Sequence, residues 1–187
     1  YHFSTTGGAD DDTCHTPLEA SAPNNLRFNR WHSPCFISRR RPELGTQKEK
    51  EMLDTLLAPK SIAVIGASGK KGKVGYEILA NLVEAGYEGA IVPVNPKSEK
   101  ILGIPCYPSL NDFDGKVELS VIVVPAAHVL QSVKDSITAG AKSVVVITAG
   151  FKEVDEEGAA LEDEIKELCN SRGVRLLGPN CLGVINT

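Results

Sequence analysis

Residues 61–83 read SIAVIGASGKKGKVGYEILANLV, and this stretch decides the fold. It opens with an uninterrupted apolar run, which is typical of a strand buried on both faces of a parallel sheet. Glycines follow at positions 66, 69 and 72, and apolar residues then recur at helical spacing until Gly86. This order of strand, glycine-rich loop and helix predicts the start of a β-α-β unit.

The same alternation continues to the end of the chain. Further strands are expected at residues 90–94, 119–124, 143–148 and 174–177, and further helices at 46–57, 126–139 and 155–173. Strands that alternate with helices form a parallel sheet covered on both faces. We therefore expect an α/β domain over residues 46–187, with a five-stranded doubly wound parallel sheet of the Rossmann-like type. We expect the strand order 3-2-1-4-5, with a ligand beyond the carboxyl ends of the strands at the switch point between strands 1 and 4.

Residues 1–45 show neither helical nor strand periodicity. Between Glu19 and Glu43 they contain five arginines and no acidic residue. We interpret this segment as a disordered leader, and an organellar targeting segment is the alternative. The chain begins at Tyr1 rather than at a methionine and stops just after a strand and loop, so we expect it to be part of a longer protein, truncated at its C-terminal end.

Composition argues against several classes of protein. The net charge of −4 argues against a nucleic-acid-binding protein, which usually carries a basic surplus. No apolar run approaches the roughly 18 residues that a membrane-spanning helix needs. The five cysteines are odd in number and contain no CxxC pair, which indicates reduced thiols rather than a disulfide framework or a zinc site. We expect a cytoplasmic protein with no metal site.

The loop after the first strand has the features of a phosphate site. Its three glycines let the backbone turn sharply and approach a ligand closely, and the next helix directs free N–H groups at the same place. A hydroxyl and several lysines add hydrogen bonding and positive charge. The candidate residues are Gly66, Ser68, Gly69, Lys70, Lys71 and Gly72. The spacing is neither that of a dinucleotide fingerprint nor that of a Walker A loop.

The loop after the second strand narrows the choice of ligand. An NAD site places an acidic residue here to bind the ribose hydroxyls. This strand ends instead in Val94-Asn95-Pro96-Lys97. A cation at this point suits a phosphorylated ribose, so Lys97 is a candidate for binding either the 2′-phosphate of NADP or the 3′-phosphate of coenzyme A (CoA).

Five motifs occur together in this chain: SIAVIGAS with its glycine loop at 61–72, PVNPK at 93–97, VIVVPA at 121–126, ITAGF at 147–151 and GPNCLGVIN at 178–186. Together they resemble the CoA-binding domain of the ADP-forming acetate–CoA (acyl-CoA) ligases and, less closely, of the succinyl-CoA synthetase α subunit. The resemblance covers the whole α/β part and none of the leader.

The resemblance implies a map of contacts with CoA. The glycine loop from Ser68 to Lys71 falls where the family holds the CoA phosphates, and Lys97 falls where a basic residue after the second strand meets CoA. Val124 and Pro125 fall beside the implied path of adenine or pantetheine. The implied contact at the fourth strand corresponds to Ile147, Thr148 and Ala149. Asn180 falls near the reacting end of the coenzyme. At the position of Ala149 the succinyl enzyme has a glutamate. In lacking this glutamate, the chain resembles the ADP-forming ligases.

The resemblance also implies an enzyme larger than this chain. In these ligases an acid, CoA and a nucleoside triphosphate give an acyl-CoA through a phosphohistidine on a second domain. None of the four histidines here matches that position, so we expect no catalytic residue and no activity from this chain alone. The implied partners are an ATP-grasp domain or subunit, which binds ATP or ADP with Mg²⁺, and the phosphohistidine domain. A stand-alone or regulatory CoA-binding module, as in the ligase-like part of a protein lysine acetyltransferase, and an NADP-dependent oxidoreductase remain open.

Overall fold

The computed structural model describes residues 47–183. The predicted leader, residues 1–45, lies outside the described residues, so its disorder stays a prediction. The last four residues, including the end of the GPNCLGVIN motif, also lie outside them.

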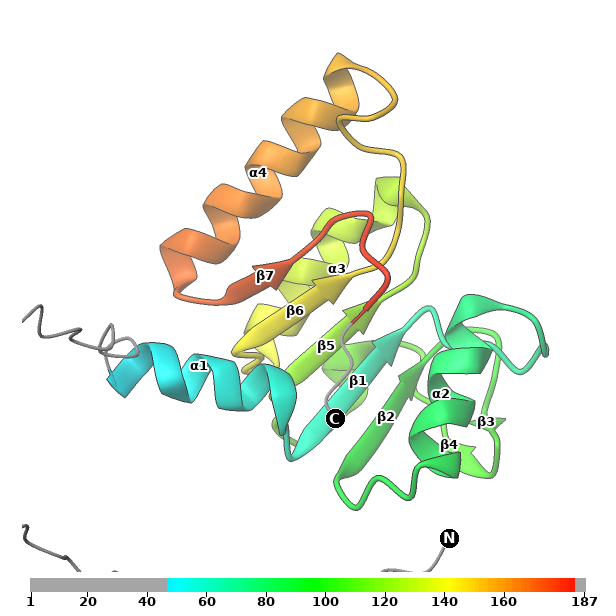
Figure 1. Ribbon diagram of the computed structural model, residues 1–187. Coiled ribbons are helices and arrows are strands. Elements are labelled where there is room, and N and C mark those ends of the chain that lie inside the picture. Colours follow the sequence, from blue (N-terminus) through cyan, green and yellow to red (C-terminus); the bar gives the residue numbers. More distant parts are fainter. Residues whose placement is uncertain (1–46, 184–187) are drawn as a thin grey trace, which may run out of the picture. The chain divides into compact units, whose positions relative to one another are not determined.

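One parallel sheet organises the described part of the chain (Figure 1). Its five strands are β1 (Ser61–Ile65), β2 (Ala90–Val94), β5 (Leu119–Ile122), β6 (Ser143–Val146) and β7 (Arg175–Leu177). Neighbouring strands pair in parallel throughout, in the order β2-β1-β5-β6-β7. The predicted five-stranded parallel sheet is confirmed.

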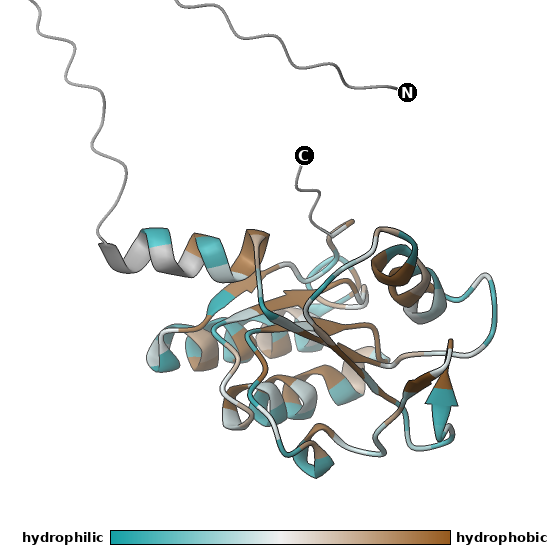
Figure 2. Ribbon diagram, turned by 90° about the horizontal axis from the view of Figure 1, so that it is seen from below, coloured by the Kyte–Doolittle hydropathy of each residue, from teal (hydrophilic) through white to brown (hydrophobic). Residues whose placement is uncertain are grey.

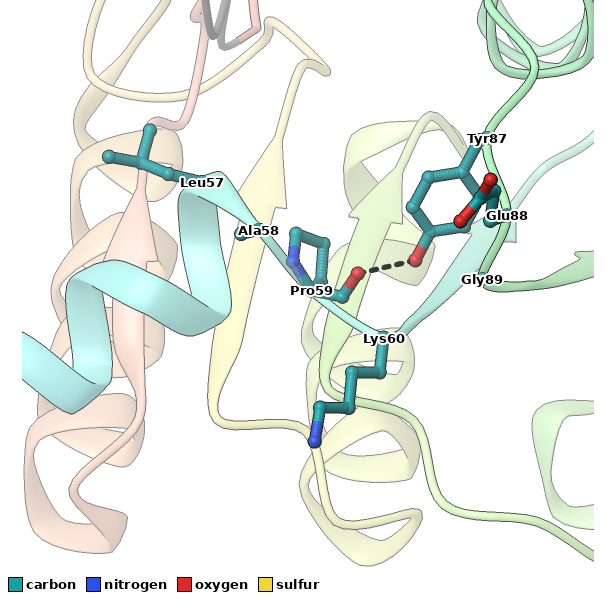
Figure 3. A pocket seen from close by; sticks show the side chains of 7 residues that line it. All are labelled: Leu57, Ala58, Pro59, Lys60, Tyr87, Glu88 and Gly89. Atoms are coloured by element: carbon teal, nitrogen blue, oxygen red, sulfur yellow. Dashed lines mark hydrogen bonds between the residues drawn. The ribbon is translucent and has the colours of Figure 1, made fainter.

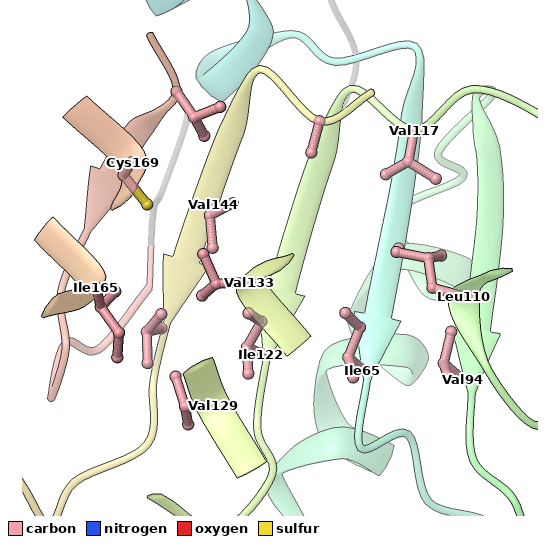
Figure 4. Packing of buried hydrophobic residues seen from close by; sticks show 14 of the residues in the cluster. Ile65, Val94, Leu110, Val117, Ile122, Val129, Val133, Val144, Ile165 and Cys169 are labelled. Atoms are coloured by element: carbon pink, nitrogen blue, oxygen red, sulfur yellow. The ribbon is translucent and has the colours of Figure 1, made fainter. Parts of the chain in front are cut away.

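Helices cover both faces of this sheet, as expected for a doubly wound domain. They are α1 (Gln47–Leu57), α2 (Val74–Glu84), α3 (Ala126–Thr138) and α4 (Glu156–Arg172). Because side chains alternate along a strand, Ala63 and Ile65 face α3 and α4, while Ile62 and Val64 face α2. Figure 4 shows the first of these two cores, and Figure 2 shows hydrophobic strands enclosed by helices that carry hydrophilic residues.

The predicted strand order is wrong. The third long strand, β5, pairs with β1 and not with β2, so the order of the five strands is 2-1-3-4-5. The reason lies at the outer edge of β2, where Tyr107 already makes the backbone hydrogen bonds that another strand would use. Its N–H donates to Pro93 O at 2.9 Å, and its carbonyl accepts from Asn95 N at 2.9 Å. The switch point therefore lies between β1 and β5.

The connection from β2 to β5 was not predicted in detail. It holds the short antiparallel pair β3 (Lys100–Ile101) and β4 (Ile104–Pro105), followed by the 3₁₀ turn η1 (Leu110–Asp112). Strands of two residues carry too little periodicity to be found by sequence pattern. The connection returns beneath the sheet, where Leu110 and Val117 are buried in the same core as α3.

The ends of α4 follow the sequence signals. Asp155 caps the helix, and its Oδ1 accepts the N–H of Gly158 at 2.7 Å. Gly173 ends the helix at a φ of 65°, a left-handed conformation that favours glycine. Among residues 47–183, no helix has the length and apolarity to cross a membrane, and no three metal-ligating side chains come together.

A buried carboxylate joins α4 to the loop that follows β6. Glu162 is 5% exposed, and its Oε1 lies 2.7 Å from the Lys166 ammonium and 3.1 Å from that of Lys152. The hydrogen bond from Lys166 lowers the pKa of Glu162 below its ordinary 4.5, and Lys152 acts in the same direction against the opposing effect of burial. Glu162 therefore stabilises the folded state above pH 4.5, and this contribution is lost as the pH falls through the lowered pKa.

Replacing Glu162 by glutamine should lower the free energy of unfolding at pH 7 by about 1–2 kcal/mol, because the negative charge that attracts the ammonium groups of Lys152 and Lys166 is lost. The deficit should shrink as the pH falls below 4.5 and through the lowered pKa of Glu162, because the parent then loses the same contribution. Urea unfolding at several pH values measures both effects. Glu164→Gln is the matched control, since that side chain is 58% exposed and its nearest cation lies 4.0 Å away. Equal losses in the two variants at pH 7 would contradict this assignment.

Candidate functional site

The loops at the carboxyl ends of the strands lie along one edge of the sheet (Figure 1). The structure brings all the residues predicted as site residues to this edge. They are Gly66, Ser68, Gly69, Lys70, Lys71 and Gly72 after β1, Lys97 after β2, Val124 and Pro125 after β5, Ile147, Thr148 and Ala149 after β6, and Asn180 after β7. Parallel strands produce this gathering, because their carboxyl ends all meet at the same edge.

The beginning of the glycine loop is packed between two neighbours. Gly66 has a φ of 91°, and a Cβ there would lie 3.0 Å from the carbonyl carbon and oxygen of Val123. From the other side, Gly75 in the first turn of α2 approaches so closely that a Cβ on it would collide with the carbonyl oxygen of Gly66. Sequence reasoning missed Gly75, although a glycine inside a predicted helix is a signal of close packing.

The three loop glycines are not equivalent. Gly72 has a φ of 83°, a conformation that side chains rarely adopt, so the turn requires glycine there as it does at Gly66. Gly69 has no positive φ, and nothing lies within 4 Å of a Cβ built on it. At Gly69 the backbone conformation therefore does not require glycine, and only the close approach of a ligand would demand it.

Two backbone donors at the start of α2 have no partner within the described residues. Lys73 is the N-cap residue and makes no side-chain capping bond. Within the described residues, the N–H groups of Val74 and Gly75 have no hydrogen-bond acceptor. Such donors at a helix N-terminus, together with the helix dipole, favour an anion.

Two side chains hold the rest of the loop in shape. The Ser68 hydroxyl oxygen accepts the N–H of Lys70 at 3.1 Å, so this predicted phosphate contact also supports the loop. The N–H of Gly72 donates to Glu77 Oε1 at 2.7 Å. Glu77 was missed by sequence reasoning, which gives no signal for a bond that reaches back five residues.

Exposed lysines are concentrated on the glycine loop and on the loop after β2. Lys70, Lys71 and Lys73 are exposed, and Lys97 is exposed on the adjacent loop. None of these four ammonium groups forms an ion pair with a carboxylate of residues 47–183. The edge therefore presents four exposed cations that form no ion pair with a described carboxylate, which suits a ligand with more than one phosphate.

The other loops are joined to one another by single hydrogen bonds. The Thr148 hydroxyl donates to Val124 O at 2.6 Å, and Asn180 N donates to Thr148 O at 3.0 Å. Gly150, at a φ of 104°, donates its N–H to Glu153 Oε1 at 2.8 Å, and this bond lowers the pKa of Glu153. These loops offer half-buried apolar side chains, Val124 and Ile147, beside polar backbone.

The three free thiols of residues 47–183 have structural positions. Cys181 is half-buried, and its Sγ donates to Val146 O at 3.3 Å. Burial raises the pKa of the half-buried Cys106 thiol and raises that of Cys169 to about 11. A raised pKa keeps a thiol protonated and therefore a poor nucleophile.

A separate hollow lies at the opposite edge of the sheet, between the end of α1 and the turn before β2. It has a volume of about 630 Å³ and is lined by Leu57, Ala58, Pro59, Lys60, Tyr87, Glu88 and Gly89 (Figure 3). The Tyr87 hydroxyl donates to Pro59 O at 2.6 Å and so ties its two walls together. None of the predicted site residues lines it.

The comparison with protein families decides between the ligands left open by the residues. Residues 60–187 match the family model of the CoA-binding domain. The chain belongs to the CoA-binding domain family. This confirms the predicted family and its cofactor, CoA.

Proteins similar to this CoA-binding domain include ADP-forming ligases. It is 48% identical over 135 residues to acetate–CoA ligase [ADP-forming] I of Archaeoglobus fulgidus, covering 72% of this chain and 19% of that protein. It is 44% identical over 137 residues to the α subunit of acetate–CoA ligase [ADP-forming] II of Pyrococcus furiosus, covering 73% of this chain and 30% of that subunit. The chain therefore spans less than a third of the length of either relative.

A solved structure shares the fold. The dinucleotide-forming acetyl-coenzyme A synthetase 1 of Candidatus Korarchaeum cryptofilum, solved with phosphate and ADP, superposes with a TM-score of 0.66 at 44% identity. The match covers 70% of this chain and 28% of that one. Succinate–CoA ligase [ADP-forming] subunit α 2 of A. fulgidus is more distant, at 32% identity over 129 residues, 67% of this chain and 42% of that subunit.

Replacing Gly75 by alanine should destabilise the domain by about 1–3 kcal/mol, because the added methyl group collides with the Gly66 carbonyl. The sign of this stability change distinguishes the collision from the ordinary effect of the substitution. Inside a helix, replacing glycine by alanine otherwise stabilises the protein by about 1 kcal/mol. Gly69→Ala is the matched control and should leave the unfolding free energy within about 0.5 kcal/mol of the parent, because nothing lies near its Cβ. Urea unfolding of the two variants tests this. A Gly75→Ala protein as stable as the control would show that the helix can move away from the loop.

Proposed function

We propose that this domain binds CoA along the carboxyl edge of the sheet and supplies it to acyl-CoA formation by an ADP-forming acid–CoA ligase. The observation on which the site rests is the glycine loop. The N–H groups of Val74 and Gly75, at the start of α2, have no described acceptor, and the exposed lysines that precede them in the chain have no described carboxylate partner. CoA is a ligand of matching chemistry, because it carries a diphosphate and a separate 3′-phosphate.

The diphosphate fits the glycine loop. Gly66 and Gly72 give the loop a backbone conformation that other residues rarely adopt, and Gly69 leaves open space above it. The Lys70 and Lys71 ammonium groups and the Ser68 hydroxyl can then reach phosphate oxygens that the helix N-terminus attracts. We assign the diphosphate to residues 66–72 on these grounds.

The 3′-phosphate fits the loop after β2. Lys97 is exposed, and its own N–H is held by Asn95 Oδ1 at 2.8 Å, so its side chain leaves a fixed turn. Asn95 in turn binds the first loop, which brings the two cationic loops side by side. We assign Lys97 to the 3′-phosphate and the glycine loop to the diphosphate.

The remainder of CoA is thin and weakly polar. Val124 and Pro125 lie at the start of α3, and Ile147, Thr148 and Ala149 lie on the neighbouring loop. This run of apolar side chains and backbone can accommodate pantetheine, with Asn180 toward its reacting end. The Thr148 hydroxyl is already donated to Val124 O, so it serves the ligand only as an acceptor.

The complete reaction would need parts beyond the described residues. Among residues 47–183 the one histidine is His128, exposed in the first turn of α3. We propose that the phosphohistidine and the ATP-grasp unit, which would bind ATP or ADP with Mg²⁺, belong to another domain or subunit. The relatives support this, because acetate–CoA ligases of A. fulgidus and P. furiosus are several times longer than the matched region.

Calorimetric titration with CoA and with NADP tests the ligand directly. CoA should bind, and NADP should bind at least about tenfold more weakly, a difference of roughly 1.4 kcal/mol. Gly69→Val is the matched variant: its side chain enters open space, so the fold should persist while the phosphate loses its close approach. Affinity for CoA within about threefold of the parent, under roughly 0.7 kcal/mol, would show that the loop does not hold the phosphates. Tighter binding of NADP would overturn the proposal.

Lys97 should distinguish CoA from a ligand that lacks one phosphate. Lys97→Ala should weaken CoA by roughly 1–3 kcal/mol, about 5- to 150-fold, and should hardly change the affinity for 3′-dephospho-CoA. The parent should prefer CoA by a similar factor, and this preference should fall as salt rises, because an exposed ion pair is screened. Equal losses for the two ligands would assign Lys97 to the diphosphate or to a structural role.

A further inference from the structure

Asn95 connects the two loops that we assign to the CoA phosphates. Its side-chain Nδ2 donates to Ala67 O in the glycine loop at 2.6 Å. Its Oδ1 accepts the N–H of Lys97 in its own loop at 2.8 Å. A single half-buried side chain therefore uses its donor on one loop and its acceptor on the other.

The backbone of Asn95 is held from the opposite side. Its N–H donates to Tyr107 O at 2.9 Å, and its carbonyl accepts the Cys106 thiol at 3.7 Å. The side chain thus extends from a backbone that the β2–β5 connection keeps in place. Rotation of this side chain would break its hydrogen bonds to Ala67 and Lys97. The backbone N–H and carbonyl of Asn95 already have partners, so they offer no new hydrogen bond in exchange.

The two loops depend on Asn95 to different degrees. The glycine loop has other attachments, since Gly66 N and Ala67 N both donate to Val94 O, at 3.0 and 3.2 Å. The turn that carries Lys97 has fewer. Pro96 has no N–H to donate, and the remaining backbone bond of the turn, from Ser98 N to Asn95 O, is long at 3.4 Å.

We propose that Asn95 is a positioning residue that sets the preference of this site for a ligand with a phosphate on the ribose. It does so by fixing the Lys97 turn against the glycine loop, so that one CoA molecule meets both cationic loops at once. The inference rests on the proposed CoA site and on Lys97 as the contact of the 3′-phosphate. Asn95 itself touches neither phosphate in this account.

The chemistry of asparagine matches this task. An aspartate at this position could accept from Lys97 N but could not donate to Ala67 O, and its charge would repel the phosphate. A serine side chain is too short to reach across to the neighbouring loop. The amide alone among short side chains carries a donor and an acceptor on one planar group.

The test measures the affinities of CoA and of 3′-dephospho-CoA for the parent and for Asn95→Ala. The ratio of the two affinities should fall from about 5- to 150-fold in the parent to within about twofold in the variant, although Lys97 is still present. The affinity for 3′-dephospho-CoA should change by less than about threefold, because the glycine loop keeps its bonds to Val94. Thermal unfolding checks that the Asn95→Ala protein is folded. If that protein is not folded, the measurement uses Asn95→Leu, which preserves side-chain volume.

A double-mutant cycle shows whether Asn95 acts through Lys97. In a Lys97→Ala background, Asn95→Ala should cause no further loss of the ratio, because the group it positions is gone. Ser109→Ala is the matched control. It removes a side-chain oxygen that accepts Asn111 N at 3.3 Å in the same β2–β5 connection, and it should leave the ratio unchanged.

The outcomes separate this inference from the proposed function. Two results would overturn the positioning role while leaving CoA binding intact. One is an unchanged affinity ratio in Asn95→Ala, which includes equal weakening of both ligands. The other is additive losses in the double-mutant cycle. A parent that binds both ligands equally would overturn it together with the Lys97 assignment. Failure of the parent to bind either ligand would instead remove the proposed function itself.

Discussion

The contact on which the rest of this domain depends is the close packing of backbone around Gly66. On one side it meets the carbonyl group of Val123 at the end of β5, and on the other its own carbonyl is covered by Gly75 of α2. Neither Gly66 nor Gly75 has a side chain to hold these elements apart, so strand, loop and helix approach within van der Waals distance. That packing places the N-terminus of α2 beside the loop at the carboxyl end of β1, where the N–H groups of Val74 and Gly75 have no acceptor among the described residues.

The electrostatics of the site follow from that placement rather than from the charge of the protein. The chain carries a net charge of −4, yet residues 66–73 contain three lysines and no acid. Glu77, whose carboxylate accepts the N–H of Gly72, holds the loop in shape and sets one negative charge against its three lysines. An acidic protein thus presents a local cationic edge, which is suited to a polyanionic ligand.

The strand order shows how a short connection can decide topology. Both orders, 3-2-1-4-5 and 2-1-3-4-5, satisfy right-handed crossovers and the alternation of strands and helices. The choice is made by Tyr107, which occupies the edge of β2 with two backbone hydrogen bonds and leaves β5 to pair with β1. The same segment holds the backbone of Asn95, so the topology of the sheet and the shape of the second phosphate loop have a common cause.

The amino-acid sequence by itself determined the class of fold, the long elements and the loops of the site. The signals that predicted them are local, because each depends on residues a few positions apart. They are the apolar periods of the long strands and helices, the glycine loop, and the caps of α4 at Asp155 and Gly173. The gathering of the predicted site residues followed from the same reasoning, since parallel strands end at one edge. Only the tertiary structure decided the strand order, the separate roles of Gly69, Gly72 and Gly75, and the contacts of Asn95 and Glu77. These depend on which backbone groups of distant segments meet, and a hydrogen bond such as that from Asn95 to Ala67, 28 residues apart, leaves no period in the sequence.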